Sequence, residues 1–267
     1  MIFYTDLKNT EIDGDPLLDK RYDRIAYENL GGTITSSGDE LGYDAANVQS
    51  QATYNKWRSD SAVGGTIELD LGSIQPVDSI SINSEKLAGT YTFEQWDGAA
   101  WQVIDSQTDL ILTTNEPLIY NFVEVSTDKI RVTIVSTTAP EITNLYVGTA
   151  MVMERALFSG HTPITLGRNT VSRPNMSNTG QFLGLSIIKK GVSTSYSWDN
   201  LTTDFYRDTF DSFAKVSKFP FFIAWNSDKF TTDVGYVWSG ADLRPTFNGT
   251  RDWMSVSMDV AGVNYGE

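Results

Sequence analysis

The chain has 267 residues, a formal net charge of −14, 40% hydrophobic and 12% aromatic residues, and no cysteine. This composition is typical of a globular protein with an apolar core. The lack of cysteine excludes disulfides, thiolate nucleophiles and cysteine-ligated zinc. No segment approaches the roughly 20 apolar residues of a membrane span, so no membrane partner is expected. The first residues carry neither a basic nor an apolar run, so no signal peptide is predicted.

The charge is distributed unevenly along the chain. Residues 1–150 carry 23 Asp and Glu against 9 Lys and Arg, whereas residues 151–267 carry 11 of each. This step predicts two domains that meet near residues 148–154. We therefore expect an N-terminal arm (1–25), a first domain (26–150) and a second domain (151–267). A nucleic-acid partner is not expected, because binding phosphates needs a basic surface. A plainer interpretation is that the acidic surface keeps the first domain soluble.

The first domain consists of short segments with strand periodicity. Residues 66–71 alternate apolar and polar side chains, which places Ile67, Leu69 and Leu71 on one face, and residues 77–82 repeat the pattern. The pair Asp97-Gly98, between two short apolar runs, predicts a hairpin turn. Further strands are predicted at 118–125, 129–135 and 142–147. Many short strands separated by turns are typical of a β-sandwich or barrel.

The second domain contains one segment with helical periodicity. Tyr206, Phe210 and Phe213 are spaced i, i+4, i+7, Thr202 or Thr203 can cap the first turn, and Pro220 follows the helix. The polar segment Asn169–Gly180 is predicted to be a long loop. Strands are predicted at 184–192, 193–198, 221–225, 235–239 and 253–260; in the last of these, four apolar residues (Met254, Val256, Met258 and Val260) share one face.

Six segments of the first domain, in order, resemble the discoidin or coagulation factor 5/8 C-type family of galactose-binding-like modules. They are the opening segment 44–59, the strands 65–72 and 77–82, the hairpin Trp96–Trp101, and the closing strands 131–133 and 142–148. The resemblance implies a jelly-roll sandwich with Trp57 and Trp101 in its core. We therefore predict a mainly β protein, with a galactose-binding-like jelly-roll sandwich followed by a β-rich domain with one α-helix.

The same resemblance implies a ligand site on the loops and a structural calcium ion. Candidates for carbohydrate contact combine aromatic rings with cationic groups; they are Tyr43, Tyr54, Lys56, Arg58 and Lys86. The alternative is that Tyr54 and Arg58 only brace the loop. Candidate calcium ligands are oxygen donors; they are Asp44, Asn47, Glu141 and Asn144. Asn144 stands where the family has Glu, which weakens the site, so calcium binding remains open.

The sequence offers no recognisable catalytic set. His161 is the single histidine, and it precedes Thr162-Pro163 as a turn residue would. A nucleophile elbow and an HExxH zinc helix are both absent. We therefore predict that the chain is not an enzyme, although paired carboxylates contributed by separate strands stay open.

The second half resembles small β-rich proteins of bacteriophage tails. This resemblance implies a structural virion protein of a phage tail tip or baseplate, a distal tail protein. Its partners would be copies of itself in a ring, other tail proteins and a host glycan, and it would act outside the cell as part of the virion. The alternative is a secreted carbohydrate-active enzyme or lectin with a discoidin-like binding module.

Overall fold

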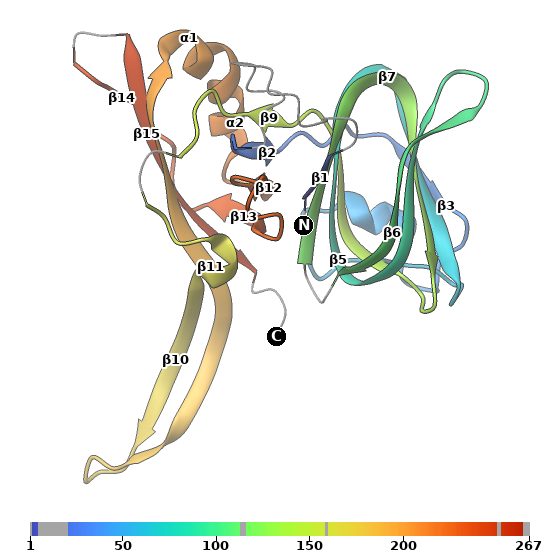
Figure 1. Ribbon diagram of the computed structural model, residues 1–267. Helices are drawn as coiled ribbons and strands as arrows, with labels where there is room; N and C mark the ends of the chain where they lie inside the picture. The colour runs from blue at the N-terminus through green and yellow to red at the C-terminus, as the bar shows by residue number, and fades with distance from the viewer. Residues whose placement is uncertain (1, 5–20, 113–115, 158–159, 250–251, 264–267) are drawn as a thin grey trace.

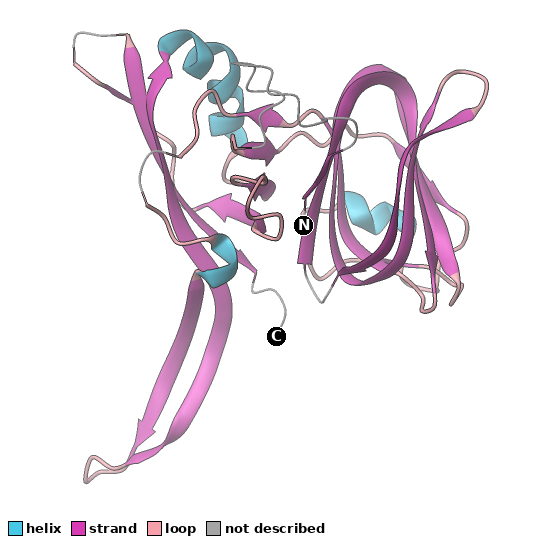
Figure 2. Ribbon diagram, viewed as in Figure 1, coloured by secondary structure: helices cyan, strands magenta, loops and turns pink. Residues whose placement is uncertain are grey.

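The computed structural model describes residues 2–4, 21–112, 116–157, 160–249 and 252–263 (Figure 1). Most of them lie in two β-sheets, and one helical segment covers part of the second sheet (Figure 2). The predicted mainly β fold is confirmed. Within these residues no helix is long and apolar enough to cross a membrane. Most of the predicted N-terminal arm, residues 5–20, lies outside the described part of the chain.

The first sheet is built on two long, strongly bent strands, β5 (Gly64–Trp96) and β7 (Glu116–Ser136). Each is divided by its bends into straight legs that pair separately. Two legs of β5, residues 64–70 and 89–95, pair with the second half of β7, and the middle leg, residues 75–84, pairs with its first half. The middle leg also pairs with β8 (Glu141–Gly148). The remaining strands flank these legs: β1 (Ile2–Tyr4), β3 (Thr33–Ser36), β4 (Trp57–Arg58) and β6 (Trp101–Leu112). The strands thus form two packed faces, the predicted jelly-roll sandwich.

Apolar side chains from both faces fill the sandwich. Ile67 and Leu69 are buried, and Leu71 packs against them half-buried, as their alternation predicts. The middle leg contributes Val77, Ile80 and Ile82, all fully buried. Each such side chain contributes about 1.5–3 kcal/mol by leaving water. The predicted hairpin turn is confirmed at Asp97-Gly98, where the Asp97 N–H donates to the carbonyl oxygen of Ala100 at 3.1 Å and Gly98 has φ 95°.

The strands of the second sheet come from segments that precede and follow the jelly roll in the sequence. Its order is β10 (Arg168–Met176), β11 (Phe182–Thr202), β15 (Trp253–Val263), β13 (Val234–Ser239), β12 (Phe221–Ala224), β2 (Arg24–Ala26) and β9 (Met151–Val152), with β14 (Thr246–Phe247) beside β15. Ile25 in β2 lies directly opposite Met151 in β9. The jelly roll is therefore inserted between two adjacent strands of this sheet.

The predicted helix is confirmed and has three parts, α1 (Thr203–Phe205), the π-helical turn η3 (Tyr206–Phe210) and α2 (Asp211–Val216). The Thr202 side chain caps it by accepting a hydrogen bond from the Phe205 N–H at 3.2 Å. Tyr206, Phe210 and Phe213 are buried in the core of the second domain. Two short 3-10 helices, η1 (Ala45–Gln49) and η2 (Ile164–Leu166), lie in connections.

The prediction of a long loop at Asn169–Gly180 is wrong. Most of this segment is strand β10, which pairs antiparallel with residues 182–192 of β11. A short turn joins the two strands, and the Ser177 N–H donates to the carbonyl oxygen of Gln181 at 2.8 Å. The Asn, Ser and Thr content of this segment is typical of loops. It nevertheless forms a strand because it pairs with β11, which carries most of the apolar side chains of the hairpin. The hairpin extends well beyond the rest of the sheet (Figure 1).

The two domains share a buried apolar contact. Ile119 and Tyr146, on the outer side of the jelly roll, pack in one cluster with Phe222 and Tyr236 of β12 and β13. The Tyr146 hydroxyl donates to the carbonyl oxygen of Pro220, and the Tyr236 hydroxyl donates to that of Gln51, each at 3.0 Å. Apolar packing and these hydrogen bonds together fix the jelly roll against the second sheet.

One buried carboxyl group, that of Asp23, and one half-buried carboxyl group, that of Asp78, lie near this junction. Burial raises the pKa of Asp23 to about 7, against hydrogen bonds from the Trp198 indole and the Leu157 backbone that lower it. Burial also raises the pKa of Asp78 to about 6, although the Ala150 N–H donates to it at 2.7 Å. In both groups burial therefore stabilises the protonated form relative to that of a solvent-exposed carboxyl group.

Candidate functional site

The segment between β3 and β5, residues 37–63, is the opening loop of the jelly roll. Its backbone folds onto itself, because the Glu40 N–H donates to the carbonyl oxygen of Arg58 at 2.9 Å and the Arg58 N–H donates to that of Tyr43 at 3.2 Å. Trp57 anchors the loop. Its ring is fully buried, as predicted, and its indole N–H donates to Oδ1 of Asp39 at 2.8 Å.

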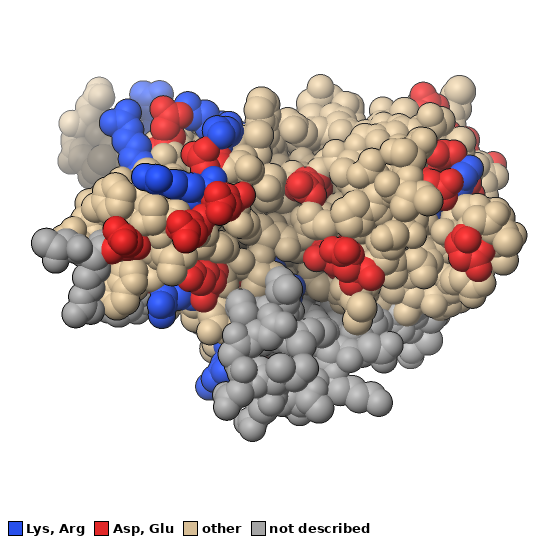
Figure 3. All heavy atoms as spheres, turned by 90° about the horizontal axis from the view of Figure 1, so that it is seen from above, with Lys and Arg blue, Asp and Glu red and all other residues tan. Residues whose placement is uncertain are grey.

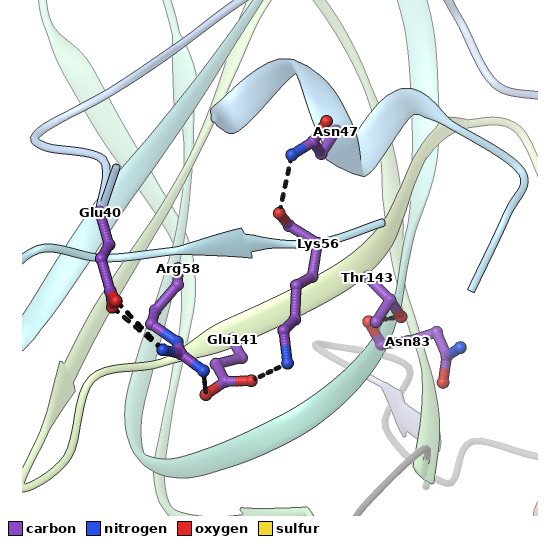
Figure 4. A network of polar contacts seen from close by, with 7 residues as sticks. All are labelled: Glu40, Asn47, Lys56, Arg58, Asn83, Glu141 and Thr143. Atoms are coloured by element: carbon purple, nitrogen blue, oxygen red, sulfur yellow. Dashed lines mark hydrogen bonds and ion pairs between the residues drawn. The ribbon is translucent and has the colours of Figure 1, made fainter. Parts of the chain in front are cut away.

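An ionic network joins the opening loop to the start of β8 (Figure 4). Nζ of Lys56 lies 2.6 Å from Oε2 of Glu141, and Nη2 of Arg58 lies 2.7 Å from Oε1 of the same carboxylate. Nη1 of Arg58 donates to both carboxylate oxygens of Glu40 at 3.2 Å. The Glu141 side chain is only 5% exposed, so the two cations compensate the cost of burying its charge.

The same contacts affect the Arg58 guanidinium. Desolvation acts to lower the pKa of Arg58, but hydrogen bonds to Glu40 and Glu141 and the charges of both carboxylates raise it. Arg58 and Glu141 are direct cross-strand partners in the β4–β8 pair, which holds the side chains on the same side of the sheet. These contacts cross-link the opening loop to β8.

The structure brings three of the predicted carbohydrate-contact residues together. The Arg58 guanidinium lies over the Tyr43 ring at 4.6 Å from its centroid, and Nζ of Lys56 lies 5.7 Å from that centroid. Tyr54 is on the same loop, but its side chain is turned to solvent and is 83% exposed. Lys86 is in β5 opposite Glu141, and its side chain lies outside the described part of the structure.

The predicted calcium ligands are engaged with other groups. Both Glu141 oxygens face cations, and the side-chain amides of Asn47 and Asn144 donate to backbone carbonyls of the opening loop at 2.9 and 2.6 Å. Asp44 is exposed at the start of η1. Among the described residues no group of acidic or histidine side chains has metal-binding geometry. These residues do not fit a calcium site at Glu141, where Lys56 supplies the positive charge.

The outer face of the jelly roll carries a second polar and aromatic group. The prediction that Trp101 is a core residue is wrong, because its ring is half-buried and packs edge-on against Trp96. The Arg131 guanidinium lies 4.2 Å from the centroid of the Trp101 ring and pairs through two nitrogens with Glu94. The Glu94 pKa is lowered mainly by the hydrogen bond to Arg131.

A sequence signal for this face was present. Tyr91 and Phe93 point into the core, so strict alternation turns Glu94 and Trp96 outward. Trp101 is the cross-strand partner of Trp96 and therefore shares its outward face.

The single histidine lies among aromatic rings in the second domain. The His161 ring stands edge-on to Trp225 at a centroid distance of 4.3 Å. Burial lowers the pKa of His161, and the charge of Asp233 opposes that shift. Asp233 itself accepts hydrogen bonds from Thr165 and the Trp225 indole. These contacts pack the ring of His161 in place.

Comparisons with known proteins give partial likenesses only. No protein family matches the sequence, and no curated protein matches it. A GH29 fucosidase of Ruminococcus gnavus, solved with fucose, is similar at 20% identity and a TM-score of 0.42 over 47% of this chain and 28% of its own. The chain thus spans little more than a quarter of that enzyme.

Two shorter solved structures are matched along almost their whole length. Chitosan-binding module 1 of a Paenibacillus sp. IK-5 chitosanase/glucanase has 20% identity and a TM-score of 0.41, over 46% of this chain and 100% of its own. The family 32 carbohydrate-binding module of C. perfringens NanJ, solved with galactose, has 15% identity and a TM-score of 0.42, over 48% and 99%.

Proposed function

We propose that the first domain binds carbohydrate through its opening loop. The observation that carries this proposal is the exposure of Tyr54. This residue is 83% exposed and lies on a loop that the ionic network around Glu141 holds in place. An exposed flat ring offers an apolar surface to the C–H faces of a sugar, and nearby polar groups can bind its hydroxyls. Because the loop is already held in place, binding loses little conformational entropy.

Glycan-array binding followed by calorimetry on the full chain tests the proposal. We expect Tyr54→Ala to weaken binding of the best glycan at least about tenfold, since a stacked aromatic contact is lost, without a change in melting temperature. Trp101→Ala, which removes a half-buried ring on the outer sheet face, is the matched control and should leave affinity unchanged. If Trp101→Ala abolishes binding and Tyr54→Ala does not, the opening loop is not the binding site.

The proposal includes no catalytic step. His161 is packed between aromatic rings, and Glu141 is paired with two cations, so neither side chain is placed as a general base toward an open site. We therefore propose a binding protein rather than a carbohydrate-active enzyme. Hydrolysis of any glycan bound on the array would contradict this part of the proposal.

A second candidate function is that of a structural subunit in a phage tail tip or baseplate. The observation that favours an assembly role is the long exposed hairpin of β10 and β11, which carries apolar side chains into solvent. In this role the chain would be present in several copies in a virion, and the jelly roll would contact a neighbour or a host glycan. Quantitative mass spectrometry of purified virions tests it, and absence of the chain from particles would rule it out.

A further inference from the structure

Residues 168–190 form a two-stranded ribbon that we call the arm; it is distinct from the N-terminal segment 1–25. It comprises β10 and the part of β11 that precedes Gly191, where pairing with β15 begins. Beyond that point, among the described residues, the two strands pair only with each other, and they project away from both domains (Figure 1). The arm therefore has two open faces and a free edge along β10.

The arm exposes apolar side chains at an unusual density. On β11 alone, five large apolar residues are between 53% and 68% exposed; they are Phe182, Leu183, Leu185, Ile187 and Ile188. Val171 and Met176 on β10 are exposed too. An isolated two-stranded ribbon is marginally stable in water, and contiguous exposed apolar surface marks an interaction site. The arm has the properties of a segment that is covered by a partner.

The charge of the arm is entirely positive. Its four charged residues are Arg168, Arg173, Lys189 and Lys190, and all four are exposed. The sequence contains no Asp or Glu between Glu154 and Asp199. A partner that covers the arm must therefore be acidic to match these charges.

The first domain of this same chain has that property. Residues 1–150 carry a net charge of −14, and exposed carboxylates in it include Asp44, Asp60, Asp97 and Glu124. Seen from above, Asp and Glu side chains lie over the first domain with few cations among them, whereas both signs mix over the second domain (Figure 3). The arm of the same molecule points away from this surface (Figure 1), so a contact between them requires a second molecule.

We propose that the arm docks onto the acidic first domain of a second copy of this chain. Apolar residues of the arm supply the buried area, and its four cations fix the orientation by pairing with carboxylates. This inference goes beyond carbohydrate binding and does not depend on it, because the opening loop and the arm are separate parts of the fold. Such a contact is heterologous and repeats from copy to copy, closing into a ring where the rotation permits.

Sedimentation of the full chain tests whether the arm drives self-association. We expect concentration-dependent oligomers that weaken as salt is raised, because exposed charges are screened. Arg173→Glu with Lys189→Glu should raise the dissociation constant at least about tenfold. Arg207→Glu with Lys229→Glu, the same change of charge at exposed sites outside the arm, is the matched control and should not change it. Leu185→Ser with Ile187→Ser should also weaken association while the melting temperature stays constant.

A zero-length amine-to-carboxyl cross-linker then identifies the partner surface. Because the arm contains no carboxylate, Lys189 and Lys190 can cross-link only to residues outside it. In oligomers made from mixed isotope-labelled and unlabelled chains, we expect intermolecular links from these lysines to carboxylates of residues 24–150. Links to residues 191–267 of the second copy, or a chain that stays monomeric at all accessible concentrations, would overturn the proposal. Loss of glycan binding without loss of oligomers would affect the carbohydrate proposal alone.

Discussion

Replacing Asp23 by Asn should change how the stability of the protein depends on pH. In the folded chain burial raises the Asp23 pKa from 3.8 to about 7, whereas in the unfolded chain the carboxyl group is solvated and ionises near its ordinary pKa. The folded state thus holds a proton that the unfolded state releases. The stabilisation is complete below pH 3.8 and is lost as pH rises through 7. The difference between the pKa values of the folded and unfolded chains corresponds to about 4 kcal/mol.

Asn at position 23 does not titrate and keeps an oxygen that can accept from the Trp198 indole N–H. We expect the difference in unfolding free energy between Asp23→Asn and the parent chain to move in favour of the variant by up to about 4 kcal/mol between pH 4 and pH 8. Urea unfolding followed by tryptophan fluorescence at closely spaced pH values measures it. Asp60→Asn, at an exposed site, controls for the change in net charge. Parallel curves for parent and Asp23→Asn would refute the reasoning.

Two further predictions concern the jelly roll. A chelator should leave the melting temperature unchanged, because Lys56 rather than a metal ion pairs with Glu141; a clear decrease would show that a metal ion stabilises the loop. Trp57→Ala should cost about 3–5 kcal/mol, since it empties a fully buried site and leaves Asp39 without its indole donor, whereas the half-buried Trp101→Ala should cost about 1–2 kcal/mol. Equal losses in denaturant unfolding would contradict this ranking.

Local patterns in the sequence were sufficient to predict most of the framework. The alternation at Ile67 and Leu69, the aromatic spacing of the helix and its Thr202 cap all describe contacts within a few residues. Strand β10 and the ionic network of the opening loop could not be predicted from local patterns, because both depend on contacts with other strands. The strand β10 is stabilised by pairing with β11 rather than by its own side chains, so its polar composition pointed to a loop. Tertiary pairing outweighed local preference there.

The support of the candidate site depends on contacts that are distant in sequence. Lys56 and Glu141 meet only because β4 pairs with β8 in a register that places Arg58 opposite Glu141. No spacing rule connects residues so far apart, and the resemblance to calcium-binding modules pointed to Glu141 and Asn47 as metal ligands instead. The sequence could supply the residue types of the network, but the pairing register was needed to show that Lys56 and Arg58 both pair with Glu141.

The position at which the jelly roll is inserted determines what a replacement of this segment would require of the second sheet. Its two ends leave the second sheet from neighbouring strands, with Ile25 opposite Met151, so whatever joins them need only span a short gap. Insertions whose ends lie close together are tolerated well by the host domain. The order of strands in the host sheet therefore does not require the jelly roll as the connection between β2 and β9. Any segment that replaced the jelly roll would also have to cover Phe222 and Tyr236, which are buried against it.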